Sequence, residues 1–174
     1  MAAEATEKPA ALSAILKIFI DDPVFKEEYK KHVAGHNKKI QTEFPDSGFD
    51  LLLPKSVEVY DKSSIFINFG VKCSMEHMGN PCSYSLHSRS STFSKYRIFL
   101  CNSVGIIDSG YRGHICGEFY RPPGFVGDSY LDQNSRIVQL CSPTLAPIFV
   151  EIVDKESDLG MSARGTGGYG STGK

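Results

Sequence analysis

One short stretch of the chain combines a carboxylate, an aromatic ring and an arginine. In "NSVGIIDSGYRG" (102–113), Asp108 follows two isoleucines, and Tyr111 precedes an Arg-Gly pair. A positioned carboxylate can take a proton from water, and an aromatic ring can stack on a sugar or a base. The stretch predicts a β-hairpin that carries both groups near its tip. The same pattern also fits an ordinary hairpin with an aspartate in its turn.

Three other stretches carry donors that suit phosphate oxygens. In "SRSS" (88–91) an arginine stands beside hydroxyl groups, although such a run is also typical of a turn. In "SRIVQL" (135–140), Arg136 and Gln139 lie on a short expected strand. The stretch "RGTGGYGSTGK" (164–174) is rich in glycine, which lets the backbone approach an anion closely. Taken alone, "SRIVQL" indicates only the edge of a sheet, and the glycine-rich stretch also fits a disordered tail.

The glycine-rich stretch also matches the beginning of a P-loop, from Gly168 to Lys174. A P-loop follows a buried strand, whereas the preceding "DKESDLGMSA" is polar and shows no strand pattern. The P-loop interpretation therefore fails on its context. Residues 161–174 are expected to form a flexible arm instead.

Composition limits the partners and the compartment. The 174 residues include 19 basic and 20 acidic ones, so the charge balance gives no case for binding nucleic acid or an anionic membrane. No apolar run approaches the ~18 residues of a membrane span. Five cysteines at scattered spacing, with a poor signal-peptide pattern at the N-terminus, favour an intracellular protein with free thiols, in cytoplasm or nucleus. Zinc binding by Cys73, His77 and Cys82 is an alternative that lacks an evident fourth ligand.

The chain divides into a short helical segment and a long strand-rich one. Residues 1–13 are expected to be loose. A helix is predicted over 23–35, with Asp22 as N-cap, Pro23 in the first turn and Gly35 at the end. Its apolar stripe is Phe25, Tyr29 and Val33, and the basic run "KEEYKKHVAGHNKK" is interpreted as a solvated helix face. This is the one helix that the sequence predicts clearly.

From residue 48 onward the apolar period changes to two. The segments "SVEVYDKSSIFINFGVKC", "CSYSLHSRSS", "RIFLCNSVGIID", "GHICGEFY", "RIVQLC" and "APIFVEIV" are rich in β-branched and aromatic residues and are separated by turn residues. This pattern predicts an all-β sandwich or barrel of jelly-roll type, in one domain over residues 14–160. No internal repeat is present.

Taken in chain order, five stretches resemble the motifs of the trimeric dUTPase family. They are "GFDL" (48–51), "SRSSTFSK" (88–95), "GIIDSGYRGHI" (105–115), "SRIVQL" (135–140) and "RGTGGYGSTGK" (164–174). Single motifs of this kind are modest signals, but five in the right order rarely arise by accident. The segment "MEHMGNPCSYSLHSRSS" further resembles the branch found in large cytoplasmic DNA viruses, which would place the protein in the host cytoplasm.

The resemblance implies a β-clip or jelly-roll barrel that assembles as a homotrimer with active sites shared among subunits. The implied reaction is Mg2+-assisted hydrolysis of dUTP to dUMP and pyrophosphate. In that reaction Asp108 would be the general base that activates the attacking water, and Asp50 would contact the metal only through water. The implied substrate-binding residues are Arg89, Ser90, Ser91, Asn102, Ile106, Ile107, Tyr111, Gln139, Arg164, Tyr169 and Gly170.

Two other functions stay open on the residues. A dCTP deaminase relative would need a glutamate base near the hairpin, and only Asp108 is available there, because His114 and Glu118 are interpreted as structural. A binding or regulatory protein of the same fold without catalysis would show loss of the aspartate, of the Arg-Ser pair or of the glycine-rich arm, and all three persist.

Overall fold

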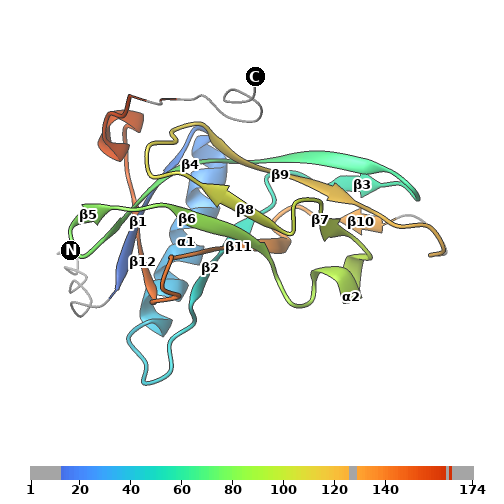
Figure 1. The fold of residues 1–174 in the computed structure, drawn as a ribbon, viewed down its shortest axis with the longest axis horizontal. Helices are drawn as coiled ribbons and strands as arrows, with labels where there is room; N and C mark the ends of the chain where they lie inside the picture. The colour runs from blue at the N-terminus through green and yellow to red at the C-terminus, as the bar shows by residue number, and fades with distance from the viewer. Residues whose placement is uncertain (1–12, 126–128, 164, 166–174) are drawn as a thin grey trace.

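The computed structural model describes residues 13–125, 129–163 and 165, and its strands form two principal sheets (Figure 1). The first has the order β12–β1–β4–β9–β7, with β5 beside β4, and the second has the order β2–β11–β6–β8. A third, two-stranded sheet pairs β3 with β10. The strands are β1 (Ala14–Ile20), β2 (Gly48–Leu52), β3 (Val57–Val59), β4 (Ser64–His77), β5 (Asn80–Pro81), β6 (Tyr84–Ser88), β7 (Phe99–Leu100), β8 (Val104–Ile107), β9 (His114–Tyr120), β10 (Ser129–Leu131), β11 (Arg136–Cys141) and β12 (Ile148–Ile152).

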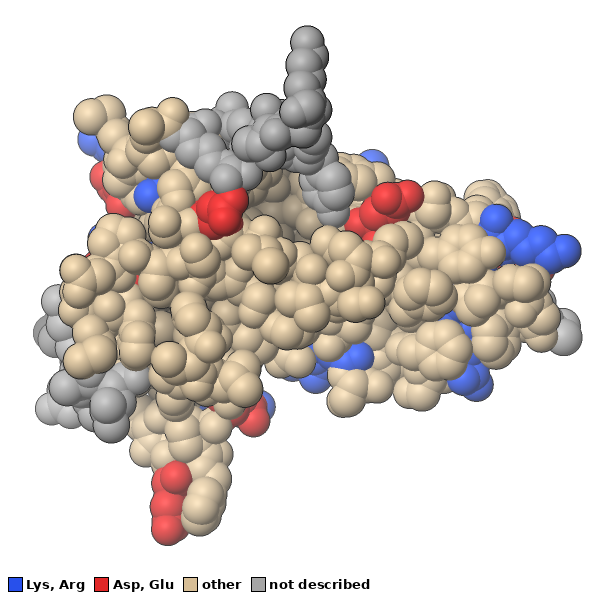
Figure 2. Space-filling model, in the orientation of Figure 1, with Lys and Arg blue, Asp and Glu red and all other residues tan. Residues whose placement is uncertain are grey.

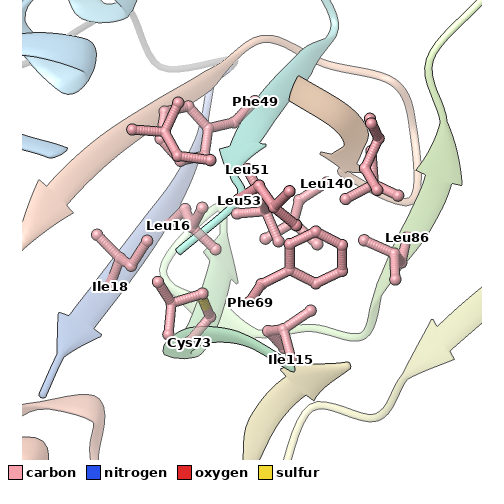
Figure 3. Packing of buried hydrophobic residues seen from close by; sticks show 14 of the residues in the cluster. Leu16, Ile18, Phe49, Leu51, Leu53, Phe69, Cys73, Leu86, Ile115 and Leu140 are labelled. Carbon is pink, nitrogen blue, oxygen red and sulfur yellow. The ribbon is translucent and has the colours of Figure 1, made fainter. Parts of the chain in front are cut away.

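The core fills the space between the two principal sheets. Strand β1 alternates buried and half-buried residues along its whole length, which is the period-two pattern of a strand with one face on a core. Figure 3 shows Leu16 and Ile18 of this strand on one side, Leu86 and Leu140 of the second sheet on the other, and Phe69 of β4 between them. All five side chains are less than 2% exposed. The structure thereby confirms the predicted all-β class.

The predicted helix is present but longer than expected. Helix α1 (Pro23–Lys39) begins as predicted, with the Asp22 carboxylate accepting hydrogen bonds from the first-turn amides. The prediction that Gly35 ends it is wrong, because the helix continues through His36 and Asn37, which both bond to β12. These tertiary contacts offset the ~1 kcal/mol by which glycine disfavours a helix interior relative to alanine.

Helix α1 covers one edge of each principal sheet, at β12 and at β2. On β12, the Asn37 amide donates to the Val150 carbonyl at 2.9 Å and accepts from the Val150 N–H at 3.0 Å. On β2, the Leu52 N–H donates to the Tyr29 hydroxyl at 3.0 Å. Sheet edges carry unpaired backbone groups that need a cover, and side chains of α1 supply it here. In Figure 1 the helix crosses behind the strands close to β12 and β2.

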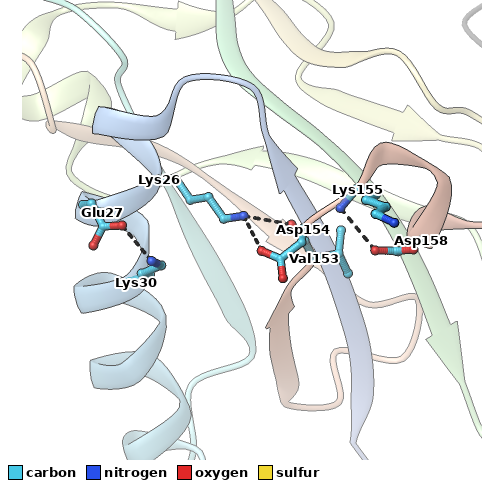
Figure 4. Close-up of polar contacts among 7 residues, drawn as sticks. All are labelled: Lys26, Glu27, Lys30, Val153, Asp154, Lys155 and Asp158. Atoms are coloured by element: carbon cyan, nitrogen blue, oxygen red, sulfur yellow. Dashed lines mark hydrogen bonds and ion pairs between the residues drawn. The ribbon is translucent and has the colours of Figure 1, made fainter.

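The N-terminal end of α1 is fixed by an ion pair to the segment after β12. Lys26 Nζ lies 2.8 Å from an Asp154 carboxylate oxygen and 3.4 Å from the Val153 carbonyl oxygen (Figure 4). Lys30 and Glu27, one helical turn apart, form a second pair on the solvent side at 2.7 Å. The short 3-10 helix η1 (Glu156–Leu159) follows directly. These contacts hold the N-terminal end of the helix against the segment that follows β12.

Replacing Tyr29 by phenylalanine should destabilise the fold. The Tyr29 side chain is fully buried, so loss of its hydroxyl would leave the Leu52 N–H without a partner and without water. A buried unsatisfied donor costs about 1–3 kcal/mol, which thermal or urea unfolding would measure. Tyr60→Phe is the matched control, because the Tyr60 hydroxyl bonds Glu58 at the surface, and its change should stay within about 0.5 kcal/mol. Equal effects in the two variants would show that this buried bond contributes nothing.

Two further features differ from the sequence prediction. The chain forms a second helix, α2 (Thr92–Tyr96), directly after "SRSS". Strands β8 and β9 do not form a hairpin, because β8 pairs with β6 in one sheet and β9 pairs with β4 and β7 in the other.

All five cysteines are free thiols, and Cys73 lies in the core, where burial raises the pKa of its thiol. No helix in the described part of the chain has the length and apolarity of a membrane span.

Candidate functional site

A cavity of about 550 Å3 lies between α1 and the second sheet, and we call it the α1 cavity. Four of the sequence-predicted residues line it together: Asp50 of β2, Arg89 and Ser90 after β6, and Gln139 of β11. The sheet register explains this meeting, because Gln139 pairs with Asp50 on one side and with His87 on the other. Ser91 lies next to this group as the N-cap residue of α2, but it does not line the cavity.

Asp50 and Arg89 form an ion pair inside the α1 cavity. The Nε atom of Arg89 lies 2.8 Å from one Asp50 oxygen, and Nη1 of Arg136 lies 3.3 Å from the other. The Arg89 backbone is fixed by its N–H, which donates to the Ile137 carbonyl at 3.0 Å. Its Nη1 donates to the Arg136 carbonyl at 3.2 Å. These contacts use part of the five-donor guanidinium fork, whose remaining donors suit a phosphate oxygen.

Gln139 occupies the space above Gly48. A Cβ atom on Gly48 would lie 2.1 Å from the Gln139 side-chain oxygen and 2.9 Å from its carbonyl carbon. Real side chains do not approach so closely, so only glycine at position 48 lets Gln139 keep this position. The position of Gln139 in the fourth predicted motif therefore depends on Gly48 in the first.

Gly48→Ala should displace Gln139 while the fold persists. Gln139 is flexible and half-buried, so its side chain can move away from a new methyl group. Loss of a hydrogen bond to a charged ligand should lower kcat/KM on a nucleotide substrate by about tenfold or more. Gln139→Ala should give the same loss, and the double variant should lose no more than either single variant. Additive losses in steady-state kinetics would show that the two positions act separately.

Two histidines of α1 also line the α1 cavity, and the sequence did not single them out. His32 Nε2 donates to the Asp50 carbonyl and His36 Nε2 to the Ile148 carbonyl, each at 2.8 Å. The interpretation of this run as a wholly solvated face is wrong at these two positions, which are half-buried. Burial lowers the pKa of both imidazoles, more than the neighbouring carbonyls and the Asp50 charge raise it. Their i, i+4 spacing was the available signal.

The lowered pKa of His32 and His36 predicts weaker folding in mild acid. Below the ordinary histidine pKa of 6.5 the unfolded chain binds protons that the folded chain rejects, so stability should fall as pH drops until the folded pKa is passed. Above pH 6.5 the two histidines are neutral in both the folded and the unfolded chain, so no stability is lost there. Thermal unfolding between about pH 7.5 and 5 should show this decline, and it should be shallower in a His32→Gln/His36→Gln variant. If the stability of the wild type and of the double variant falls equally with pH, the decline does not come from these two histidines.

Asp108 and Tyr111 lie on the segment that joins β8 to β9, residues 108–113, which we call the Asp108 loop. The Tyr111 N–H donates to the Asp108 carbonyl at 2.9 Å, and the Tyr111 hydroxyl donates to the His114 carbonyl at 2.9 Å. The Tyr111 ring lies against Gly113, where a Cβ atom would come within 2.4 Å of its hydroxyl oxygen. Both Asp108 and Tyr111 are half-buried. The loop therefore carries Asp108 and a Tyr111 ring that is fixed by its hydroxyl bond, and the predicted hairpin pairing is absent.

The remaining predicted residues of this region lie along β8. Ile106 and Ile107 pair with Ser85 and Tyr84 of β6, and Asn102 precedes the strand at its other end. Within the described residues, β8 is the last strand of its sheet, so its second edge is unpaired. Backbone donors and acceptors along that edge can read a planar ligand such as a base.

The C-terminal segment begins beside the Asp108 loop. The Arg112 side chain donates to the Gly160 carbonyl at 2.8 Å, and its backbone N–H donates to Gly165 at 2.8 Å. The Ser162 hydroxyl donates to the Gly110 carbonyl. Three predicted residues, Arg164, Tyr169 and Gly170, lie outside the residues that the structure describes.

In one chain the Asp108 loop and the α1 cavity are far apart. Gln139 of the cavity stands in register with His87, and His87 with Val104 of β8. Asp108 follows Val104 by four residues, which corresponds to roughly 13 Å along a strand, and it lies two strands away. The structure thus divides the predicted site residues into two groups that one phosphate chain cannot bridge within a single copy.

The described residues fit a magnesium ion only through water or a ligand. Mg2+ prefers oxygen ligands and keeps several waters when it is bound with phosphates. Both Asp50 oxygens already face arginine nitrogens, so this carboxylate suits an outer position. No group of three histidine, cysteine, aspartate or glutamate side chains within the described part of the chain could form a cage.

Comparison with known proteins points to one family. The dUTPase family model matches residues 39–173. Deoxyuridine 5'-triphosphate nucleotidohydrolase of Cutibacterium acnes is 32% identical over 134 residues, which cover 74% of this chain and 80% of that protein. The enzyme of the same name from Crocosphaera subtropica is 32% identical over 128 residues, covering 74% and 84%. The crystal structure of dUTPase from Streptococcus mutans aligns over 66% of this chain and 86% of that one, with 25% identity and a TM-score of 0.49.

Proposed function

This chain belongs to the dUTPase family, and on that premise we propose that it hydrolyses dUTP to dUMP and pyrophosphate. The observation that carries the proposal is the α1 cavity, in which Asp50, Arg89, Ser90 and Gln139 come together from three different strands or strand ends. These residues belong to the first, second and fourth motifs, and each contributes a polar group that suits a phosphate chain or its metal. Such a reaction keeps uracil out of DNA and supplies dUMP.

The nucleoside would bind along the free edge of β8. Backbone groups of Ile106 and Ile107 and the Asn102 side chain would pair with the uracil edge. The Tyr111 ring, held by its hydroxyl bond to the His114 carbonyl, would pack under the deoxyribose and exclude a ribose 2′-hydroxyl. Tyr169 and Gly170 of the arm, residues 161–174, would close over the base. The root of this arm already contacts the Asp108 loop, because the Arg112 N–H donates to the Gly165 carbonyl.

The phosphates would bind in the α1 cavity. Arg89, Ser90, Ser91 and Gln139 would donate to the phosphate oxygens, and Arg164 of the arm would hold the terminal phosphate. When bound with the triphosphate, Mg2+ supplies positive charge that offsets the negative charge gathering on the leaving group. Asp50 would orient the metal's water shell, because its oxygens are within reach of the arginines rather than free for direct contact.

Asp108 would act as the general base. Its carboxylate would orient a water molecule in line with the α-phosphorus and take a proton as the new P–O bond forms. The bond to the bridging oxygen of pyrophosphate breaks in the same step, and the arginine donors stabilise the departing charge.

A complete site would then need more than one copy of the chain, and we propose a homotrimer. The cavity of one subunit would meet the Asp108 loop of another, which removes the separation seen within one chain. Figure 2 shows few charged side chains over β6, β8 and β9, and β8 exposes Val104 and Ile106 by 40% and 76%. Charge-poor, apolar surfaces of this kind are typical of subunit interfaces.

A pyrophosphate-release assay on dUTP, dCTP and UTP tests the proposed activity. The proposal predicts release from dUTP only, and none from UTP because Tyr111 excludes the ribose hydroxyl. Ammonia release from dCTP would indicate a deaminase instead. Binding of dUTP without turnover would indicate a binding protein of the same fold.

A further inference from the structure

The α1 cavity has a second wall that the proposed phosphate-binding residues do not explain. Lys31, Gly35 and Lys39 recur at four-residue spacing on α1, and all three line the cavity. The dUTPase model matches residues 39–173, so most of this wall comes from a segment outside the match. This wall therefore adds residues to the cavity that do not belong to the family motifs.

The charges around the cavity favour an anion. Its lining includes four permanently charged cations and two carboxylates, a formal surplus of two positive charges; these are Lys31, Lys39, Arg89 and Arg136 against Asp46 and Asp50. Asp50 is already engaged by both arginines. The two arginines and Asp50 together carry one of these positive charges, and the two lysines with Asp46 carry the other.

Neither helix lysine is held by a strong partner. Lys31 pairs with Glu28 at 3.1 Å, but the two side chains are 76% and 41% exposed, and such surface pairs contribute little. Within the described residues, Lys39 takes part in no ion pair. Both ammonium groups are thus available to a ligand in the cavity.

Gly35 keeps the space between the two lysines open. Apart from the adjoining residues and the backbone of the helix itself, no heavy atom lies within 4 Å of the position that its Cβ would occupy. Glycine is a poor residue for a helix interior, and here it stands between cations that face the same cavity. A side chain at this position would enter the region where a ligand would meet both lysines.

We propose that Lys31 and Lys39 form the outer half of a polyphosphate cradle, opposite Arg89. They would bind the pyrophosphate end of the substrate before cleavage and inorganic pyrophosphate after it. Lysine serves as a mobile point charge for phosphate, which complements the fixed fork of an arginine on the other wall. This inference rests on the proposed function for the identity of the ligand.

The test compares two pairs of lysines on α1 that are offset from each other by one residue. Lys31→Gln/Lys39→Gln removes the cavity pair, and Lys30→Gln/Lys38→Gln removes two charges from the same helix at positions that do not line the cavity. Titration calorimetry would measure binding of inorganic pyrophosphate with Mg2+. We expect about tenfold weaker binding or more in the cavity variant, and a change within about twofold in the control variant. Equal weakening in both would overturn the proposal, because only the overall charge would then matter.

Substitutions at Gly35 provide a second test that does not touch a lysine. Gly35→Glu would place a carboxylate between the lysines, and Gly35→Gln would place a neutral group of the same size there. Both residues favour a helix more than glycine does, so the fold should persist. Pyrophosphate should bind more weakly to the glutamate variant than to the glutamine variant, by about tenfold. Equal binding by the two would contradict a cradle at this place.

Steady-state kinetics separates this inference from the proposed function. If the protein cleaves dUTP, the cavity variant should raise KM for dUTP and the inhibition constant for pyrophosphate, with kcat little changed. If the enzyme is active and both KM for dUTP and the inhibition constant for pyrophosphate stay unchanged in the cavity variant, the cradle is refuted and the proposed function stands. If the protein fails to cleave dUTP but pyrophosphate binding still depends on Lys31 and Lys39, the proposed function falls and the cradle remains.

Discussion

Asp108→Asn should abolish turnover of dUTP while leaving substrate binding nearly intact. Asparagine keeps the shape of the side chain and can still orient a water molecule, but it cannot accept the proton. General-base assistance contributes roughly 10²–10⁴-fold in rate, so kcat should fall by about that factor. The Kd for a non-hydrolysable dUTP analogue should change by less than about threefold, because the proposed contacts to uracil and phosphates do not involve this carboxylate.

Asp61→Asn is the matched control for this prediction. Asp61 is an exposed turn residue outside the cavity and outside the Asp108 loop, so the same change there should leave kcat unaltered. Stopped-flow or steady-state pyrophosphate release would measure both variants. Near-normal turnover by the Asp108 variant would remove this residue from its role as base.

Arg89→Gln should cause the second large loss. Arg89 combines an ion pair to Asp50 at 2.8 Å with donors that face the cavity, so its removal affects both the phosphate contacts and the position of the carboxylate. Loss of one preorganised charged donor at a reacting phosphate should lower kcat/KM by about 10²-fold or more. Arg136 would remain 3.3 Å from Asp50, which limits the effect on stability.

Arg97→Gln controls for the loss of an arginine in the same region. Arg97 follows α2, is exposed, and lies over the Phe125 ring at 5.3 Å rather than in the cavity. Its replacement should leave kcat/KM within about twofold, and thermal unfolding should show both variants folded. An equal loss in the two variants would assign the effect to general charge rather than to the cavity.

The sequence predicted most of the fold because its signals were local. Asp22 and Pro23 marked the start of α1, and period-two alternation marked the strands that bury one face. The end of α1 was not predictable, since Gly35 is a stop signal that long-range bonds from His36 and Asn37 overrule. The predicted hairpin of β8 and β9 was wrong for the same reason. Alternation identifies strands, but the choice of partner depends on the rest of the sheet.

The candidate site was predictable in its parts and not in its arrangement. Motif order singled out Asp50, Arg89 and Gln139, and strand register brings these three together. The contribution of α1 was hidden because a run of lysines and histidines on a helix is usually solvated. Only the folded chain shows that His32 bonds a carbonyl of β2 and that Lys31 and Lys39 face the same cavity.

The central claim is that one active site combines the α1 cavity of one copy with the Asp108 loop of another. Co-assembly of Asp108→Asn and Arg89→Gln chains, each strongly impaired alone, tests it directly. Mixed trimers, isolated through different tags on the two chains, should recover about a third of wild-type turnover, because each closed ring of three then contains one site in which both residues are intact. Isolated mixed oligomers that hydrolyse dUTP no faster than the two parent variants would show that each site is built within one chain.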